Sequence, residues 1–493
     1  MDNKMIYTPG ELRYLKLLAK QFPTVQDASN EVIRLEAILN LPKGTEHFMS
    51  DIHGEHEAFL HILESSSGEV KVKLKEFFGE QLSEEAINDL ATLIYYPEGK
   101  LSLVTEGEQD LDDWYLTTIH QLVQFCRYVS VKHTRAKVRS YIPTGYESLI
   151  DELINLCDED GFLLDQFSSI LATIIRLGQA NAVIDAICTV IKTLTCDHLH
   201  IVGDIFDRGP RADIVMDCLM EQPNVDIQWG NHDVLWMGAA SGSRTLVATV
   251  LSNSIRYNNL DVIETGYGIS LRPLSTLAMT YYSDDPCAEF RPKDNGEDEH
   301  EDVMELARMH KAAAILQFKL EGQLLARHPE YQMESRRLLH AIDMEKGTVE
   351  VEGETYALRS CHFPTIDPAD PYALTPLERE VMDRLVLEFA HSEKLQRHVQ
   401  FLYSTGGMYL RCNGNLLYHG CIPMTEDGAF APIPVTGSAV RCGKEGIDAA
   451  DLLARQGYFA TLGSKSRADG QDFLWYLGCG PFSPLFGKSK MAT

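Results

Sequence analysis

The sequence predicts an α/β protein. Short apolar runs at residues 47–51, 198–202 and 225–229 have the length and composition of strands, and each runs into a polar loop. Residues 211–222, between the second and third runs, have the apolar spacing of a helix. Strand, helix and strand in this order are typical of a βαβ unit, so we expect a sheet with parallel strands and helices on its faces.

Helical patterns separate these strands from one another and from the chain ends. Residues 1–40 carry Leu and Ile at helical spacing, and Pro42-Lys43-Gly44 breaks the pattern. Residues 56–195 are rich in Leu, Ile, Glu and Ala, and residues 240–350 are again mostly helical in pattern. The sequence therefore predicts a sheet interrupted by two long, mostly helical insertions.

Strand patterns return in the last third of the chain. They lie near residues 348–358 and within 407–421, where Asn413-Gly414 is a strong hairpin signal. We expect five segments: N-terminal helices with the first core strand, a helical insertion, a core βαβ unit, a second mostly helical insertion, and core strands with part of the closing core missing. Their predicted bounds are 1–59, 60–195, 196–240, 241–350 and 351–493.

Charge and cysteine content limit the classes of function. The 493 residues include 44 Lys and Arg and 72 Asp and Glu, a net charge of −28 with His neutral. A surface this acidic repels nucleic-acid phosphates and anionic lipid, so we expect neither as a partner. The eleven cysteines are scattered without a Cys-x-x-Cys pair, and the N-terminus has no apolar signal region. These features predict reduced thiols and a cytoplasmic protein.

The most apolar long stretch, residues 162–195, carries several charged and amide side chains. It is too polar to span a bilayer and predicts buried helices.

Four short motifs follow the predicted strands and carry the chemistry. Five of their residues are oxygen or nitrogen ligands that suit Mn²⁺, Fe or Zn²⁺. A central carboxylate can bridge two ions, and two ions about 3.5–4 Å apart can stabilise both oxygens of a phosphoryl transfer. Asp204 follows the strand that lies between the other two in the motif order and is the expected bridge. The expected metal ligands are Asp51, His53, Asp204, Asn231 and His419.

Three further residues of these motifs predict catalytic roles. Arg208 has a planar guanidinium that matches phosphate oxygens. His232 directly follows an expected ligand and could protonate a leaving alkoxide, while Asp207 could hold its imidazole in the required tautomer. The four motifs in this order, each after a strand pattern, indicate one phosphoryl-transfer site.

The motifs resemble those of the calcineurin-like metallophosphoesterases. This resemblance implies a β-sandwich core flanked by helices, with Asp51, His53 and Asp204 at one metal. It implies Asp204, Asn231 and His419 at the second metal, Arg208 on the phosphate, and the pair Asp207 and His232 in acid catalysis.

The wider text resembles one family within that superfamily, the class III fructose-1,6-bisphosphatases of bacteria. The matching segments are residues 49–55, 229–233 and 416–423, and the long gaps between motifs also agree. The resemblance implies hydrolysis of the 1-phosphate of fructose 1,6-bisphosphate in gluconeogenesis. It implies manganese at a two-metal site, where a metal-bound hydroxide is the nucleophile.

One departure from the superfamily pattern concerns the end of the chain. A further His, in a Gly-His motif after the fourth motif, completes the second metal site in the superfamily, but no His follows His419 here. We therefore expect a C-terminally truncated chain that is poorly stable or weakly active. Two alternatives stay open: a protein or nucleotide phosphatase of the same superfamily, and an inactive metal-binding remnant. The helical insertions also favour a homo-oligomer.

Overall fold

The structure is a computed structural model that describes residues 7–79, 81–107, 110–156, 161–293, 301–435 and 440–488. The chain divides into two compact units. The first comprises Met1–His47 and Ile62–His198, and the second comprises Phe48–His61 and Leu199–Thr493. The predicted five-segment division stays a prediction, although most of the predicted insertion 60–195 lies within the first unit.

The first unit is helical. Its largest core forms where apolar faces of α5, α7 and α11 meet, and α11 alone contributes ten buried residues, among them Ile184, Ile187 and Ile191. This arrangement agrees with the helical spacing of the sequence between residues 56 and 195. The helices are α1 (Pro9–Gln21), α2 (Val25–Leu39), α4 (Glu69–Phe78), α5 (Glu84–Tyr95), α6 (Pro97–Gly107), α7 (Leu111–Ser130), α8 (Arg135–Ser140), α9 (Glu147–Leu156), α10 (Gly161–Arg176) and α11 (Ala180–Thr195).

The predicted N-terminal helix is two helices. Pro23 cannot supply a backbone N–H, and Thr24 caps the second helix with its side chain, so α1 ends before residue 22 and α2 starts at Val25. The short helix α3 (His56–Glu64) follows the first core strand.

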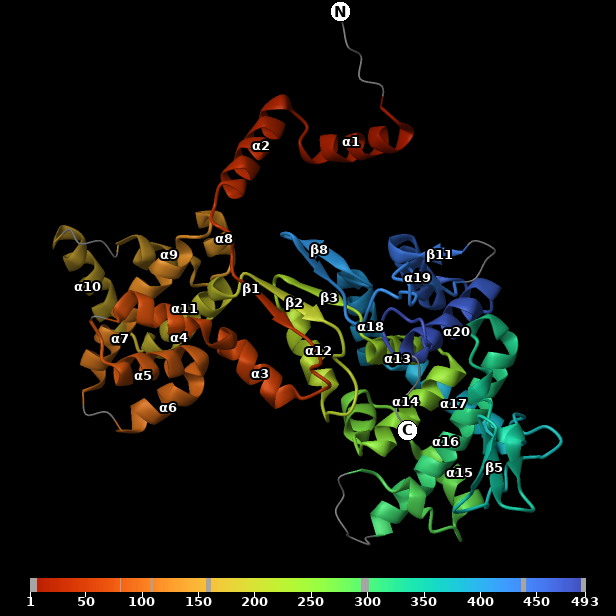
Figure 1. The fold of residues 1–493 in the computed structure, drawn as a ribbon. Helices are drawn as coiled ribbons and strands as arrows, with labels where there is room; N and C mark the ends of the chain where they lie inside the picture. The colour runs from red at the N-terminus through yellow and green to blue at the C-terminus, as the bar shows by residue number, and fades with distance from the viewer. Residues whose placement is uncertain are drawn as a thin grey trace, which may run out of the picture. The chain divides into compact units, whose positions relative to one another are not determined.

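The second unit is built on a parallel sheet, seen in Figure 1 with β1, β2 and β3 side by side. The strand order is β1-β2-β3-β7, and α12 (Ala212–Glu221) connects β2 to its parallel neighbour β3. The predicted βαβ unit is therefore confirmed, and so is the α/β class. The strands are β1 (Glu46–Met49), β2 (His198–Val202), β3 (Val225–Gln228) and β7 (Gly406–Gly407).

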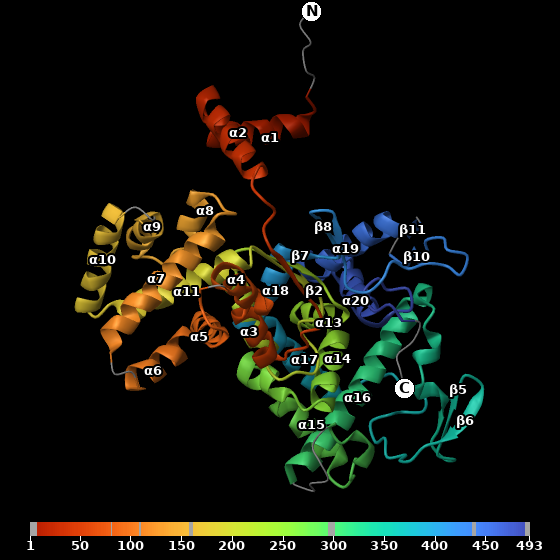
Figure 2. The same cartoon turned by 60° about the vertical axis from the view of Figure 1, so that its left-hand side comes forward.

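Helices fill the rest of the second unit. Both views show α14 beside α16, and α13 packs against α14 and α20 (Figures 1 and 2). Trp229, Trp475 and Phe206 are fully buried in this region. The helices are α13 (Asn231–Ala240), α14 (Arg244–Arg256), α15 (Arg272–Tyr282), α16 (Glu301–Arg327), α17 (Pro376–His391), α18 (Glu393–Thr405), α19 (Gly443–Phe459) and α20 (Lys465–Cys479).

The remaining strands form small antiparallel sheets. The hairpin predicted at Asn413-Gly414 is confirmed, with both residues at positive φ. The run predicted near 348–358 is also a hairpin, because Glu352 and Gly353 adopt positive φ and turn the chain. The described strands thus give one four-stranded sheet and smaller ones, and the sandwich stays a prediction. The small strands are β4 (Ile342–Asp343), β5 (Thr348–Val351), β6 (Glu354–Ala357), β8 (Leu410–Cys412), β9 (Asn415–Leu417), β10 (Pro432–Ile433) and β11 (Arg441–Cys442).

Within the described residues, no single helix has the length and apolar character needed to cross a membrane. The pair Asp165–Arg176 and Ala180–Thr195 reaches that length and composition only together, with a bend of 119° between the two helices.

Candidate active site

The predicted site residues lie in the second unit, mostly in loops that follow the sheet strands. Asp51 and His53 follow β1, Asp204 follows β2, and His232 follows β3 in the first turn of α13. The carboxyl ends of parallel strands share one edge of a sheet, which is where α/β proteins carry their active sites. His419 comes instead from the loop after the hairpin strand β9.

The backbone of the first two loops is held in an uncommon conformation. Asp51, His53 and Asp204 have φ of 53°, 52° and 56°, in the left-handed region that non-glycine residues rarely adopt. The N–H of Asp51 donates to the carbonyl of Gly203 at 3.1 Å, and the N–H of His53 donates to that of Asp204 at 2.9 Å. These bonds lock the loops together, and such strain is concentrated at functional sites.

Asp233, on the first turn of α13, organises the loop after β2. Its buried carboxylate accepts hydrogen bonds from the backbone N–H groups of Asp204, Ile205, Phe206 and Gly230 at 2.8–3.1 Å. Burial raises the pKa of Asp233, and the nearby charge of Asp204 raises it further. The sequence motif contains Asp233, but the motif alone does not reveal this positioning role.

Two glycines are required by close contacts at the centre of the site. A Cβ at Gly203 would lie 2.6 Å from Nδ1 of His419, and a Cβ at Gly230 would lie 2.1 Å from Oδ1 of Asp204. Neither distance is compatible with van der Waals contact, so only glycine fits at either position.

Asp204 is the centre of the cluster. Its Oδ2 lies 3.5 Å from Nε2 of His53 and 3.3 Å from Nε2 of His419, and its Oδ1 accepts the backbone N–H of His232 at 3.0 Å. Oδ1 of Asp51 lies 3.7 Å from Nε2 of His53. Ligand atoms of Asp51, His53 and Asp204 all lie within 4.8 Å of one another, close enough to share one ion.

The electrostatics follow from this geometry. Burial raises the pKa of Asp204, but hydrogen bonds with His419 and His53 outweigh that effect and hold its pKa well below the usual range. Burial lowers the pKa of His419, yet its interaction with Asp204 raises it to about 9. Nδ1 of His419 lies 2.8 Å from the carbonyl of Val202, which points Nε2 at Asp204.

The predicted acid pair is also brought together. Nδ1 of His232 lies 3.2 Å from Oδ1 of Asp207, and the His232 and His53 rings are 6.0 Å apart. The hydrogen bond with Asp204 raises the pKa of His53, whereas burial, and to a smaller extent the charge of Arg208, oppose the rise. Arg208 is exposed beside the cluster, and Asn231 is half-buried as the first residue of α13.

Asn259, beyond the end of α14, is a residue that the sequence analysis missed. Its Nδ2 donates to the carbonyl of Asp207 at 2.7 Å and to that of Gly209 at 3.1 Å, and the residue is only 3% exposed. It therefore fixes the loop that carries Asp207 and Arg208. It lies in no motif and more than 50 residues downstream, so only the fold reveals the contact.

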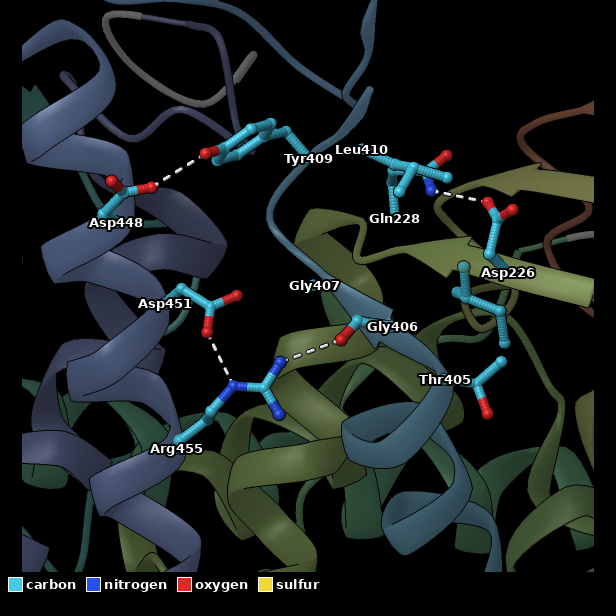
Figure 3. Close-up of a pocket in the computed structure, with 11 residues that line it drawn as sticks. Asp226, Gln228, Thr405, Gly406, Gly407, Tyr409, Leu410, Asp448, Asp451 and Arg455 are labelled. Carbon is cyan, nitrogen blue, oxygen red and sulfur yellow. Dashed lines mark hydrogen bonds and ion pairs between the residues drawn. The ribbon is translucent and has the colours of Figure 1, made fainter. Parts of the chain in front are cut away.

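Cavities among the described residues of this unit lie at and beside the cluster. One of about 240 Å³ is lined by residues 48–51, Val202 and His419, and so adjoins the cluster. A larger one of about 360 Å³ lies beside β3, β7 and α19 (Figure 3). None of the predicted site residues lines the larger cavity, whose charged side chains include Asp448, Asp451 and Arg455.

Comparison with known proteins identifies the family. The family model described as Firmicute fructose-1,6-bisphosphatase matches residues 13–493. The chain belongs to this family, as the sequence motifs predicted.

Curated relatives carry the name fructose-1,6-bisphosphatase class 3. The protein from Clostridium botulinum (strain Alaska E43 / Type E3) is 50% identical over 499 residues, with 100% of this chain and 75% of the relative covered. The Bacteroides thetaiotaomicron protein is 51% identical over 487 residues, with 98% and 73% covered. No solved structure matches the chain. These matches do not establish the expected truncation, which stays a prediction.

Proposed function

We propose that this chain hydrolyses fructose 1,6-bisphosphate to fructose 6-phosphate and phosphate at the Asp204 cluster. The observation that carries the proposal is family membership over residues 13–493, together with relatives named for this activity at about 50% identity. The chain is thus a phosphoric monoester hydrolase, and its expected place is in gluconeogenesis in the cytoplasm.

We propose the cluster as a two-metal site of a metallophosphoesterase, with Mn²⁺ as the expected ion. The donor set fits such ions: Asp204 faces imidazole nitrogens at 3.3 and 3.5 Å, and Asp51 adds a further carboxylate. Asp51, His53 and Asp204 would hold one ion, and Asp204, Asn231 and His419 the other. When bound, the ions would activate water and neutralise charge on the transferring phosphoryl group.

The chain's own residues would complete the reaction. Arg208, exposed at the edge of the cluster, would bind oxygens of the 1-phosphate. The bond between phosphorus and sugar oxygen O1 breaks as a bond from phosphorus to the water oxygen forms. His232 would give O1 its proton, and Asp207, 3.2 Å from Nδ1, would hold the imidazole in the required orientation. We also propose that the core of the second unit is a β-sandwich of the metallophosphoesterase type.

The test is phosphate release from fructose 1,6-bisphosphate with Mn²⁺ or with EDTA, beside a nucleotide and a phosphopeptide. We expect turnover of the sugar bisphosphate that EDTA abolishes and that His232→Ala lowers by about 10²–10⁴-fold. Preference for the nucleotide or phosphopeptide would favour the alternative phosphatase. Bound metal without turnover would favour an inactive remnant.

A further inference from the structure

The helices α1 and α2 are well formed but have no core of their own. Each begins with a reciprocal capping box, Thr8 with Glu11 and Thr24 with Asp27. No residue of either helix is buried. Helices of 13 and 15 residues are marginal in water on their own, so their stability must come from packing against another surface.

An apolar stripe runs along α2 with the spacing of a coiled coil. Val25, Ala28, Val32, Leu35 and Leu39 follow one another at intervals of 3, 4, 3 and 4 residues, which is the a/d pattern of a heptad repeat. Val25 is 85% exposed and Leu39 is 79% exposed. An exposed apolar stripe with this spacing is typical of a helix that packs against another helix.

The first helix carries a stripe of the same type. Leu12, Leu15 and Ala19 are spaced by 3 and 4 residues, and Phe22, the residue after the helix, continues the spacing. Leu12 and Leu15 are exposed, and Phe22 is only half-buried. The two helices therefore do not cover each other's stripes within one chain.

The charges of the two helices are complementary. Helix α1 carries Arg13, Lys16 and Lys20 against Glu11, a net charge of 3 − 1 = +2. Helix α2 has the opposite balance, 1 − 3 = −2, from Arg34 against Asp27, Glu31 and Glu36. These opposite charges favour the pairing of α1 with α2 over the pairing of like helices.

The same charges disfavour pairing of α2 with α2. In a parallel heptad seam with Val25 and Val32 at a, Glu31 takes position g and Glu36 takes position e. These positions face each other across a parallel dimer, so two carboxylates would be opposed. Lys16 takes the equivalent e position of the α1 stripe and would relieve this repulsion.

We propose that α1 and α2 form a dimerisation module in which α1 of one chain packs against α2 of a second copy. Two-fold symmetry repeats this contact. The apolar stripe of each helix is then covered, and each basic α1 faces an acidic α2. Residues 7–39 include eleven exposed large apolar side chains. Burying about half of them from each chain removes on the order of 1,000 Å² in total, the size at which specific interfaces begin.

The test is the molar mass of the full chain by light scattering during size-exclusion chromatography. We expect a dimer of 2 × 55.4 = 110.8 kDa. The double variant Val32→Asp with Leu39→Asp should halve this mass. The matched control, Asn30→Asp with Ala37→Asp, adds the same charge on the opposite face of α2 and should remain dimeric.

Charge reversal tests the proposed pairing of α1 with α2. Lys16→Glu with Lys20→Glu should raise the dimer dissociation constant by about ten-fold or more. Adding Glu31→Lys with Glu36→Lys to the same chain should restore it. A monomeric wild-type chain, which an intramolecular α1–α2 hairpin would give, overturns the proposal. So does a Val32→Asp, Leu39→Asp variant of unchanged mass, or reversed charges that fail to restore association.

Discussion

Two acidic regions of the second unit satisfy their carboxylates in opposite ways. In the larger cavity, Nε of Arg455 donates to Oδ1 of Asp451 at 2.6 Å (Figure 3). Oδ2 of Asp451 accepts the N–H of Met408 at 3.1 Å. The hydroxyl of Tyr409 donates to Asp448, which also pairs with Lys444. Here the protein itself supplies the N–H and O–H donors and the positive charge.

The side chains that face Asp204 are instead ones that can also bind metal. The ion-pair partners of Asp204 are the imidazoles of His53 and His419, which become acceptors as soon as they lose a proton. A carboxylate that faces two imidazoles is a ligand set that suits a divalent cation, and in our proposal a bound metal takes the place of the imidazole protons. A group of carboxylates therefore indicates a metal site only when the side chains that face them can also bind metal.

The largest effect should come from removing the central charge. Asp204→Asn keeps the side-chain volume but removes the carboxylate that would hold both proposed ions, so we expect phosphate release to fall by more than about 10³-fold. Steady-state assays at saturating Mn²⁺ measure this. Activity within ten-fold of wild type would show that Asp204 does not bridge the proposed ions.

A steric change beside Asp204 should come next. The Cβ introduced by Gly230→Ala would lie 2.1 Å from Oδ1 and 2.2 Å from the backbone nitrogen of Asp204. The loop must shift, so we expect weaker Mn²⁺ binding and a loss of about 1–3 kcal/mol in the free energy of unfolding. Titration calorimetry and urea denaturation report the two effects. Gly99→Ala, in α6 where an added Cβ would have no heavy atom within 4 Å, is a control for the substitution itself. Equal losses of Mn²⁺ affinity in both variants would contradict this explanation.

Asp451→Asn, the corresponding substitution in the larger cavity, should lower the stability of the fold without affecting catalysis. Asp451→Asn weakens the bond to Arg455, whose guanidinium still donates to the carbonyls of Tyr403 and Gly406. We expect the free energy of unfolding to fall by about 1–3 kcal/mol with kcat unchanged. A large loss of kcat at normal stability would mean that the two regions do not differ as described.

The smallest effect concerns a paired histidine between α16 and α20. Nε2 of His328 lies 3.0 Å from Asp472 and Nδ1 lies 2.8 Å from Glu330, and the hydrogen bond to Asp472 raises the pKa of His328. A raised pKa stabilises the fold below the unfolded value of about 6.5, and the benefit is lost as pH rises through the folded pKa.

His328→Gln removes this titration. We therefore expect the free energy of unfolding of the wild type to exceed that of the variant by up to about 1 kcal/mol near pH 6. The difference should shrink at higher pH. Urea denaturation across this pH range measures it. A difference that grows with pH would reverse the assigned sign.

The sequence allowed the βαβ unit and the cluster residues to be predicted because each motif directly follows a strand. Parallel strands bring their carboxyl ends to one edge, so Asp204 and His232 could be expected to meet. Asn259 could not be predicted, since its contact with Asp207 depends on how the chain returns after α14. The helix break at Pro23 was visible in principle, but the Leu and Ile spacing on both sides concealed it.

The central claim is that the Asp204 cluster is a two-metal site, and metal stoichiometry tests it most directly. The measurement is Mn²⁺ bound per chain at equilibrium, for wild type, Asp204→Asn and Asp451→Asn. The account predicts two ions for wild type and Asp451→Asn, and at most one, weakly held, for Asp204→Asn. Equal Mn²⁺ binding by all three proteins would contradict it.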